Sequence, residues 1–470
     1  MVEQWRRRLS ELPDQFVLNH DERPPFPAWV SRSVGSYTLH IHPDTKVHEF
    51  ANSNGQVLVI GPIVASPHEQ LEKESCPPGQ FVAISASEVF SDAGSLKQAF
   101  FDRDTKTVAS SPRLLERPGV KAVSPELFHG SRPDWYWGPR TSFREIDFLL
   151  PSQWLDLDSF TPKFRTLPRA SEHLTLEPAK MLEAELGKSF EFLRRAGHPI
   201  RLAMTGGIDS RTLFAAAIKA GVEFETYTMV SPQVHPLDLT VAKQISERFG
   251  VRHTTLRAGG INSDELDWYL WHSAGQTVTL DSDFHAAGLW DHFGRDAIHI
   301  RGLGFELGRH KYRDFVEAED EALIRADPYQ LWKKFTRPWV RPFHRYNREA
   351  FGTYARWLAD TLDLSAMDFR DRLYLEQGIG TWCASAEYGL AATGAKRVSL
   401  GNSSALYNLF LREEAESKKH GPLQREMIRA VDPAFLDYPF AKPSRAERLR
   451  YRALDTLRAV RIRQRLRRLR

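Results

Sequence analysis

Short apolar runs separated by polar turn residues fill the first third of the sequence. In several of these runs apolar and polar residues alternate, which is typical of strands with one buried face. The pattern predicts an antiparallel β-rich domain that ends near residue 165. The polar, proline-rich residues 1–35 are expected to form an extended arm or an edge segment. The expected strands cover residues 37–41, 47–50, 56–61, 100–102 and 107–109, and an apolar stretch at 147–151 closes the region.

From about residue 171 the apolar residues follow a helical spacing, and short apolar runs separate the helical stretches. This alternation predicts an α/β domain built on a doubly wound parallel sheet, with a mostly helical extension after Gly302. Ligands of such sheets bind outside the carboxyl ends of the strands. Strands are expected from residue 200 and at 222–229, 252–256 and 297–300, and helices at 181–193, 212–218, 237–249, 263–272 and 284–293.

Length and composition narrow the class of protein. A chain of 470 residues is too long for one core, and we expect domains over residues 1–165 and 171–441 followed by a tail over 442–470. No apolar run is long enough for a membrane span, and no apolar stretch follows the charged N-terminus as a signal peptide would require. Two cysteines exclude a disulfide scaffold and a cysteine-rich zinc site. A reducing cytoplasm is the expected compartment.

The C-terminal tail is strongly basic. Residues 442–470 hold twelve Lys and Arg residues and two acidic ones, a net charge of +10. The whole chain carries +4, so the rest of it carries −6. We expect the tail to form a helix that docks weakly on the acidic body and to bind RNA only weakly and non-specifically. Binding to an acidic partner or to anionic lipid is the alternative.

One glycine loop organises the second domain. The run Met204-Thr205-Gly206-Gly207-Ile208-Asp209-Ser210-Arg211 lies between an expected strand and an expected helix. Glycines let the backbone approach an anion, and the N–H groups of a helix start can then bind it. The hydroxyls of Thr205 and Ser210 add hydrogen-bond donors. Asp209 would repel a phosphate, which suggests that a Mg²⁺ ion bridges the two. The alternative is an ordinary strand–helix turn. The expected nucleotide-binding residues are Thr205, Gly206, Gly207, Asp209, Ser210 and Arg211.

This loop resembles the S-G-G-x-D-S loop of the PP-loop ATP pyrophosphatases, with Thr205 in place of the first serine. The resemblance implies ATP and Mg²⁺ as ligands and cleavage of ATP between its α- and β-phosphates. The second expected strand ends at Met229, beside the loop, and we expect Met229 to flank the adenine.

A second glycine loop follows the fourth expected strand. Its residues 301–312 resemble the second motif of asparagine synthetases and their relatives, with Gly302 and Gly304 at the glycine positions and Glu306 at the metal-binding acid. Tyr312 falls near the family's tyrosine and is a catalytic candidate. Leu303 and Leu307 replace acids of the motif, which weakens the implication for the substrate. Without the resemblance, the same residues could form a tight turn with Glu306 as a helix cap.

Two later segments extend the resemblance. Residues 398–402 and 406–410 are similar to a late segment of the asparagine synthetases, and residues 427–442 are similar to their C-terminal region. The resemblance implies that Lys442 is a catalytic lysine, whereas a solvated lysine at the start of a basic tail is the alternative. Arg211, Arg301 and Lys442 are expected to neutralise the α-phosphate.

The first domain resembles the glutaminase domain of asparagine synthetases but lacks its nucleophile. That chemistry needs an N-terminal cysteine, whereas residue 2 is Val2 and Cys76 is internal. We therefore predict a ligase without glutaminase activity, which adenylates a small-molecule or peptide carboxylate for attack by an amine. The alternatives are a PP-loop enzyme that modifies RNA and a non-catalytic nucleotide-binding scaffold. The sequence names neither substrate and does not indicate the oligomeric state.

Overall fold

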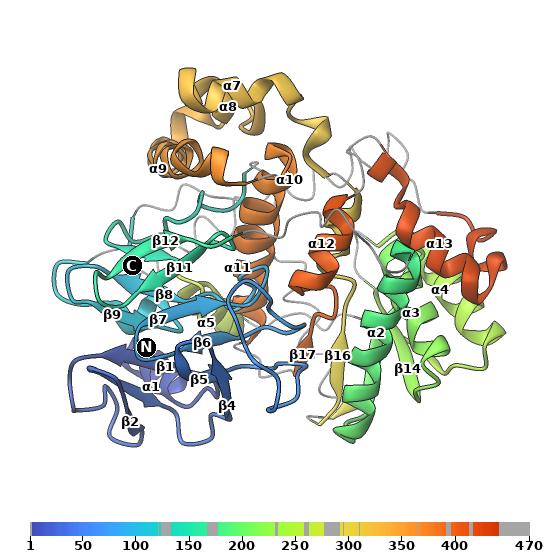
Figure 1. Cartoon of the computed structure of the whole chain (residues 1–470), viewed down its shortest axis with the longest axis horizontal. Coiled ribbons are helices and arrows are strands. Elements are labelled where there is room, and N and C mark those ends of the chain that lie inside the picture. The colour runs from blue at the N-terminus through green and yellow to red at the C-terminus, as the bar shows by residue number, and fades with distance from the viewer. Residues whose placement is uncertain are drawn as a thin grey trace.

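The computed structural model describes residues 2–120, 122–123, 133–166, 177–230, 234–257, 263–276, 292–294, 296–309, 311–365, 367–391, 396–412 and 417–440. Within these ranges the chain forms two antiparallel six-stranded sheets and one parallel five-stranded sheet. Figure 1 shows the antiparallel sheets on one side of the molecule, the parallel sheet on the other, and helices between and above them. The predicted α/β fold class, with a β-rich first part and a parallel sheet in the second, is confirmed.

The antiparallel sheets form a sandwich. The first has the strand order β10-β8-β9-β1-β3-β2 and the second β12-β11-β7-β6-β5-β4. The strands are β1 (Phe16–Asn19), β2 (Val30–Val34), β3 (Tyr37–Ile41), β4 (Val47–Asn52), β5 (Gly55–Ile60), β6 (Val82–Ile84), β7 (Glu88–Ser91), β8 (Phe100–Asp102), β9 (Thr107–Ala109), β10 (Ile146–Phe148), β11 (Gln153–Asp156) and β12 (Thr161–Phe164).

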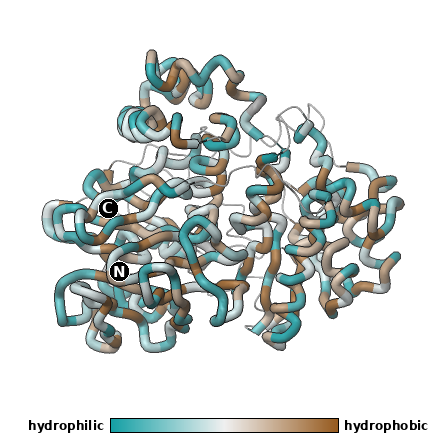
Figure 2. The backbone as a smooth tube through the Cα atoms, in the orientation of Figure 1, coloured by the Kyte–Doolittle hydropathy of each residue, from teal (hydrophilic) through white to brown (hydrophobic). Residues whose placement is uncertain are grey.

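Alternate residues of these strands face different partners. Leu39 and Phe101 of the first sheet share a core with Leu58 and Ile84 of the second. Successive side chains of a strand point to opposite faces of its sheet, so only one face of each sheet lines this core. The opposite face of the first sheet packs on the second half of the chain, where the rings of Phe100 and Tyr388 lie 5.5 Å apart. In Figure 2 hydrophilic residues gather on the outer turns of the sandwich. The two halves of the chain therefore share a hydrophobic interface.

The prediction of an extended arm or an edge segment for residues 1–35 holds for β2 (Val30–Val34), an edge strand of the first sheet, and is wrong for the residues before it. Helix α1 (Val2–Ser10) buries Trp5 and Leu9 against Trp268 and Trp271, and β1 lies between β9 and β3 inside the first sheet. The sequence pattern of α1 did not predict a helix, because α1 gains its stability from tertiary packing rather than from local propensity. Strands β6, β7, β11 and β12 were also not predicted. Their residues are buried on both faces or too few to show an alternation.

The parallel sheet has the strand order β15-β14-β13-β16-β17, so its first strand in the sequence lies at the centre. Four of its strands were predicted; the two-residue edge strand β17 was not. The strands are β13 (Ile200–Ala203), β14 (Phe224–Val230), β15 (His253–Arg257), β16 (Ile298–Ile300) and β17 (Arg397–Val398). The associated helices are α2 (Pro178–Arg195), α3 (Ile208–Lys219), α4 (Pro236–Arg248) and α5 (Ser263–His272). The expected helix at 284–293 lies almost wholly outside the described residues.

The extension after Gly302 is helical, as predicted. Its central column runs from α10 (Phe369–Leu373) through the π-helical η7 (Tyr374–Cys383) into α11 (Ala384–Ala391), and it stands between the sandwich and the parallel sheet (Figure 1). The other helices are η2 (Phe305–Arg309), η3 (Lys311–Asp314), η4 (Ala318–Asp320), α7 (Glu321–Ala326), α8 (Pro328–Phe335), η5 (Arg341–Phe343), α9 (Arg345–Thr361), η6 (Leu362–Leu364), α12 (Ser404–Arg412), η8 (Ser417–His420), α13 (Pro422–Val431) and η9 (Pro433–Leu436).

A short 3-10 helix, η1 (Pro112–Leu115), completes the elements of the sandwich. Among the helices that the structure describes, none has the length and apolar character needed to cross a membrane. The expected boundary near residue 165 falls between the end of β12 at Phe164 and the start of α2 at Pro178.

Candidate active site

The first glycine loop lies at the carboxyl end of the central strand β13, as predicted. Gly207 is the N-cap of the twelve-residue helix α3 and has an extended backbone. The N–H groups of Ile208, Asp209 and Ser210 follow, and no acceptor for them is found among the described residues. Free N–H groups at a helix start, backed by the positive end of the helix dipole, form a binding site for an anion.

Hydrogen bonds within the loop hold it in shape. The hydroxyl of Ser210 donates to the carbonyls of Thr205 and Gly207, both at 3.1 Å, and accepts from the Thr205 N–H at 3.2 Å. The Thr205 hydroxyl accepts from the Gly207 N–H at 3.1 Å. These contacts place both predicted hydroxyls at the loop. They also give the two side chains a structural task beside the predicted donation to phosphate.

Asp238, in the first turn of α4, is a member of the site that the sequence did not single out. Its Oδ1 accepts a hydrogen bond from the Gly206 N–H at 3.0 Å. A Cβ on Gly206 would come within 2.9 Å of the same oxygen, so a larger residue here would displace the Asp238 carboxylate. A carboxylate thus already binds one N–H group of the loop.

The second glycine loop lies directly beside the first because β16 pairs with β13 in parallel. A Cβ on Gly302 would come within 2.9 Å of the Cβ of Asp209, so the two loops touch at this point. Gly304 has a φ of +96° and packs against Gly401, a conformation and a spacing that exclude other residues. The predicted meeting of the two loops is therefore observed.

Asp209 is the most constrained group of the site. Its side chain is 15% exposed, and its Oδ2 forms an ion pair with the Nη2 of Arg309 at 2.5 Å. Its Oδ1 is buried and has no hydrogen-bond partner within the described part of the chain. Burial, with a smaller contribution from the charge of Glu306, raises the pKa of Asp209 to about 7, although Arg309 and Lys311 oppose the shift. A buried carboxylate oxygen without a donor is expensive unless a cation or a ligand completes it.

Besides Arg309, two charged groups act on Asp209, namely Glu306 and Lys311. Oε2 of Glu306 accepts from the Gly304 N–H at 3.0 Å, so this side chain also shapes its own loop. Burial and the charge of Arg309 lower the pKa of Lys311. Burial and the charge of Glu306 raise the pKa of the Cys383 thiol well above its usual value. The site therefore combines two carboxylates with two cations, Arg309 and Lys311, that sequence analysis did not select.

Arg211 and Arg301, both predicted to contact phosphate, bind other groups of the protein instead. The guanidinium of Arg211 donates to the carbonyls of Phe435, Tyr438 and Pro439 at 2.7 to 2.9 Å and is fully buried. Arg301 forms an ion pair with Glu387 at 3.0 Å. These bonds indicate structural roles, since Arg211 anchors the segment that precedes the tail. The predicted neutralisation of phosphate by either arginine has no support from them.

The remaining predicted residues are dispersed. The ring of Tyr312 packs against the rings of Phe315, Phe335 and Tyr374, within 6 Å of each. Met229 is buried near the end of β14. Lys442 and the tail lie outside the described residues, the last of which is Phe440 beside Arg211. The roles of Tyr312, Met229 and Lys442 stay predictions.

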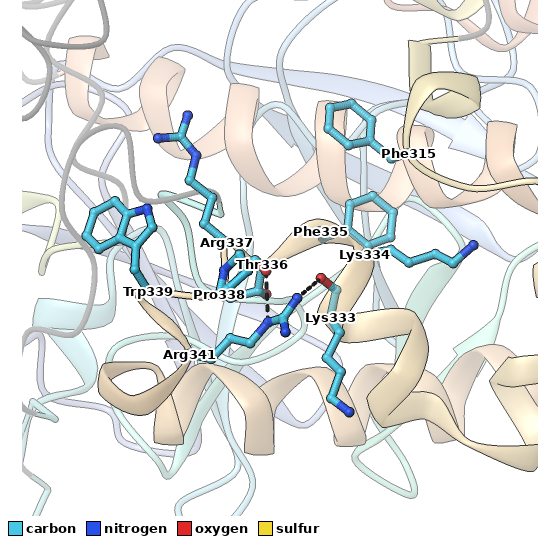
Figure 3. Close-up of a pocket in the computed structure, with 9 residues that line it drawn as sticks. All are labelled: Phe315, Lys333, Lys334, Phe335, Thr336, Arg337, Pro338, Trp339 and Arg341. Atoms are coloured by element: carbon cyan, nitrogen blue, oxygen red, sulfur yellow. Dashed lines mark hydrogen bonds between the residues drawn. The ribbon is translucent and has the colours of Figure 1, made fainter.

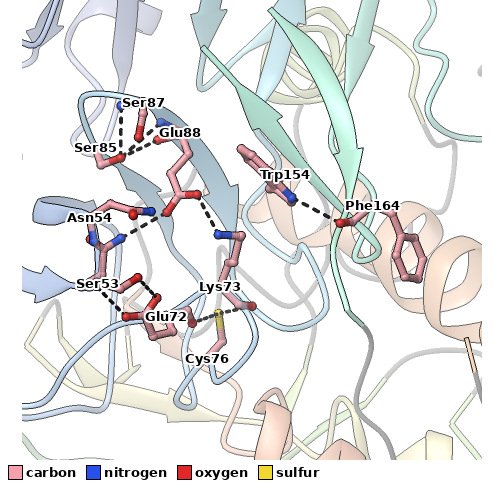
Figure 4. Close-up of polar contacts among 11 residues, drawn as sticks. Ser53, Asn54, Glu72, Lys73, Cys76, Ser85, Ser87, Glu88, Trp154 and Phe164 are labelled. Atoms are coloured by element: carbon pink, nitrogen blue, oxygen red, sulfur yellow. Dashed lines mark hydrogen bonds and ion pairs between the residues drawn. The ribbon is translucent and has the colours of Figure 1, made fainter. Parts of the chain in front are cut away.

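Cys76 has the environment of a structural residue. It is 2% exposed, and its Sγ accepts a hydrogen bond from the Nη2 of Arg165 at 2.9 Å. Burial raises the pKa of its thiol to about 11. Figure 4 shows the thiol under a network in which the buried Glu88 accepts from Lys73 at 2.9 Å and from Asn52 at 3.1 Å. A buried, protonated thiol is a poor nucleophile.

The carboxylate oxygens of the site are suitable ligands for one hard cation. No described residue satisfies Oδ1 of Asp209, and Glu306 lies close enough for its charge to act on Asp209. Mg²⁺ takes few protein ligands and draws the others from phosphate and water. Among the described residues no group of three or more potential ligands occurs. The two carboxylates alone would therefore hold the ion on the protein side, as predicted for Asp209 and Glu306.

Sequence comparisons give no family: no protein-family model matches the chain, and no curated protein does. Among solved structures, the chain is similar to a glutamine-dependent NAD+ synthetase from Acinetobacter baumannii in complex with ADP, at 15% identity and a TM-score of 0.20, over 33% of this chain and 30% of that one. It is also similar to an NMN synthetase from Francisella tularensis, at 15% identity and a TM-score of 0.23, over 52% of this chain and 96% of that one. The scores are too low for either similarity to indicate what this chain does.

Proposed function

We propose that the chain is an ATP-dependent amide-bond ligase that forms AMP and pyrophosphate and has no glutaminase activity of its own. The observation that carries the proposal is the start of α3. Three N–H groups and the Oδ1 of Asp209, all without a partner among the described residues, lie there at the contact between two glycine loops. This combination suits a phosphate chain with a bound cation.

In the proposed reaction a substrate carboxylate attacks the α-phosphorus of ATP, and an amine then attacks the acyl-adenylate. The N–H groups of α3 would bind the negative charge that develops on the leaving pyrophosphate. Mg²⁺ held by Asp209 and Glu306 would supply further charge neutralisation. Arg309 already lies 2.5 Å from Asp209 and would meet the phosphates when the nucleotide enters. The protein's contribution is positioning and electrostatics.

The first domain would act as a scaffold or a recognition surface. Cys76 of this domain is buried, and burial raises the pKa of its thiol to about 11, so it is a poor nucleophile. The amine would therefore be free ammonia or an amino group of the second substrate. An amino group of the second substrate suits a chain that makes no ammonia.

The deciding experiment is exchange of labelled pyrophosphate into ATP over a panel of carboxylates. A ligase exchanges only when its own carboxylate is present, because exchange requires the acyl-adenylate to form and revert. An RNA-modifying enzyme would require RNA. Absence of exchange with every carboxylate and with RNA would contradict the proposal.

A nucleotide-binding scaffold is the second candidate, and the ion pair between Arg309 and Asp209 favours it. In a scaffold Arg309 would replace the cation permanently, and Arg309→Met would leave ATP binding intact or strengthen it. In the ligase the same change removes a phosphate contact, and we expect the KM for ATP to rise by about tenfold.

A further inference from the structure

The first glycine loop contains two kinds of backbone N–H group. The N–H groups of residues 204–207 all have acceptors within the protein, which are, in that order, the Tyr227 carbonyl, the Ser210 hydroxyl, the Asp238 carboxylate and the Thr205 hydroxyl. Those of residues 208–210 have none among the described residues. The bonds of the first group therefore fix the shape of the loop, and the second group is left for an anion.

Asp238 differs from the other acceptors because it is charged and belongs to another helix. It lies in the first turn of α4, and its Oδ1 accepts from the Gly206 N–H at 3.0 Å. A bond between a carboxylate and a backbone N–H is charge-assisted and stronger than a bond between neutral groups. Since α4 follows β14, this bond ties the loop after β13 to the helix after the neighbouring strand.

A carboxylate in this position can act in two opposite ways. It can hold the Gly206 peptide so that the N–H groups after it face a bound phosphate, and its removal then weakens binding of the phosphate. It can instead compete with the phosphate or repel it, and its removal then strengthens binding. The position of Asp238 relative to α3 favours the first role.

Asp238 and Asp209 lie on different sides of α3. Residues two apart in an α-helix project roughly 200° from each other, so Asp209 and Arg211 point in nearly opposite directions. The charge of Glu306, in the second loop, acts on Asp209, whereas the charge of Arg211 acts on Asp238. Asp238 therefore supports the loop from the side away from the expected cation.

The two glycines of the loop differ in what their missing side chains make room for. A Cβ on Gly206 would lie 2.9 Å from Oδ1 of Asp238, and its next contacts are ordinary ones at 3.6 Å. A Cβ on Gly207 would meet only Oγ1 of Thr205, at 3.1 Å, among the described residues. Neither glycine has a positive φ, so the backbone conformation alone does not require glycine. The space at Gly206 thus admits Asp238, whereas the space at Gly207 is open to an approaching anion.

We infer that Asp238 is a positioning residue of the nucleotide site, which acts through Gly206 to hold the N–H groups at the start of α3 in the arrangement that binds the phosphates of ATP. The first glycine of the loop then serves Asp238, and the second serves the phosphate. The identity of the ligand as ATP rests on the proposed function.

The test is calorimetric titration of the full chain with ATP and Mg²⁺, without a carboxylate substrate. Asp238→Ala removes the acceptor and should weaken ATP binding by about tenfold. Asp238→Asn keeps an acceptor oxygen of the same size, so its ATP affinity should stay within about threefold of the wild type. Asp327→Ala is the matched control, because Asp327 accepts from the N–H groups of Tyr329 and Gln330 at 3.1 and 3.3 Å in another part of the chain. It should leave ATP binding unchanged.

A double-mutant cycle tests the two glycines separately. Gly206→Ala should weaken ATP binding in the wild type and have little further effect in Asp238→Ala, because the carboxylate that its Cβ would displace is then already absent. Gly207→Ala should weaken ATP binding by the same factor in both backgrounds, since its Cβ does not meet Asp238. Equal effects of Gly206→Ala in both backgrounds would overturn the assignment of this glycine to Asp238.

A second place in the molecule could bind ATP through charge alone. Figure 3 shows Lys333 and Arg341 next to each other in a pocket at the end of α8, where Arg341 donates to the Lys333 carbonyl at 2.9 Å. Lys333→Gln therefore locates the bound ATP, and it should leave the affinity unchanged. An affinity that falls with Lys333→Gln and not with Asp238→Ala would overturn the inference.

Tighter ATP binding by Asp238→Ala and Asp238→Asn would show that the carboxylate competes with the phosphates, and would overturn the inference. Unchanged binding by Asp238→Ala, or equal weakening by both variants, would overturn it as well, in protein that circular dichroism shows to be folded. If Asp238→Ala does not fold, Gly206→Ala displaces the same carboxylate and takes its place in the comparison with Asp238→Asn. A wild type that binds no ATP would refute both the inference and the proposed function. The expected pattern of affinities in a protein without pyrophosphate exchange would support the inference and refute the ligase.

Discussion

Two buried aspartates, one in each half of the chain, differ in how they are satisfied. Asp92, in the sandwich, accepts hydrogen bonds from four backbone N–H groups and from the Nδ2 of Asn402, at 2.7 to 3.2 Å. Asp209 has an ion pair on one oxygen, and the described residues provide no hydrogen-bond partner for the other. The first arrangement needs no further group, whereas the second leaves an oxygen that a cation or a ligand could complete. This difference in the satisfaction of buried polar groups supports a structural role for Asp92 and the proposed ligand-binding role for Asp209.

Asp209→Asn should produce the largest effect on activity. The neutral amide cannot hold a metal ion beside the phosphates, and we expect pyrophosphate exchange to fall by about 10²-fold or more. ATP should still bind, because the N–H groups of α3 remain. The measurement is exchange at saturating ATP together with ATP binding by calorimetry. Near-wild-type AMP release from this variant would refute the phosphate site.

Asp92→Asn should affect stability rather than chemistry. An amide presents only one acceptor oxygen to the five donors that surround Asp92, so two or more hydrogen bonds are lost. We expect the free energy of unfolding to fall by about 2–3 kcal/mol. Urea denaturation measures the loss, and exchange per folded molecule should be unchanged. A selective loss of exchange in the folded variant would show that the sandwich takes part in the chemistry.

His299→Phe should reduce the sensitivity of the protein to acid. Both ring nitrogens of His299 are buried, with no hydrogen-bond partner among the residues that the structure describes. Burial, with the charges of Arg397 and Arg201, lowers the pKa of His299 to about 4. Below about pH 6.5 this histidine binds a proton in the unfolded chain but not in the folded chain. The free energy of unfolding therefore decreases as the pH falls from about 6.5 to about 4. The variant lacks this contribution. Between pH 7 and pH 5 the variant should lose about 2 kcal/mol less of its free energy of unfolding than the wild type does.

The matched control for this prediction is His40→Phe. His40 is equally buried, but its ring nitrogens bond to Ser31 at 2.8 Å and to Asn19 and Asp21 at 3.2 and 2.9 Å. Its replacement should destabilise the protein already at pH 7. Urea denaturation at both pH values gives the comparison, and an unchanged pH dependence in His299→Phe would contradict the assigned charge state.

Cys76→Ser should produce the smallest effect. The serine hydroxyl can accept the hydrogen bond of Arg165, so we expect a change in the free energy of unfolding of about 1 kcal/mol or less. Neither the wild type nor the variant should release glutamate from glutamine. Glutaminase activity that the substitution abolishes would show that the sandwich still carries the chemistry of the domain it resembles.

The sequence by itself determined the central unit of the second domain. The apolar run before Gly206 and the helical spacing after Gly207 predicted β13, its loop and α3, because both patterns are local. The spacing of Gly302 and Glu306 after a fourth apolar run predicted that a second loop would lie beside the first, since carboxyl ends of parallel strands share one edge of the sheet.

Only the tertiary structure decided which charges meet there. Asp238 and Arg309 lie 32 and 100 residues from their partners in the loop, and no local pattern records such contacts. The same holds for Arg211, whose place in the motif suggested a phosphate ligand and whose guanidinium instead binds carbonyls more than 220 residues away. Periodicity reports which face of an element is buried, whereas the partner of a buried charge depends on packing between distant elements.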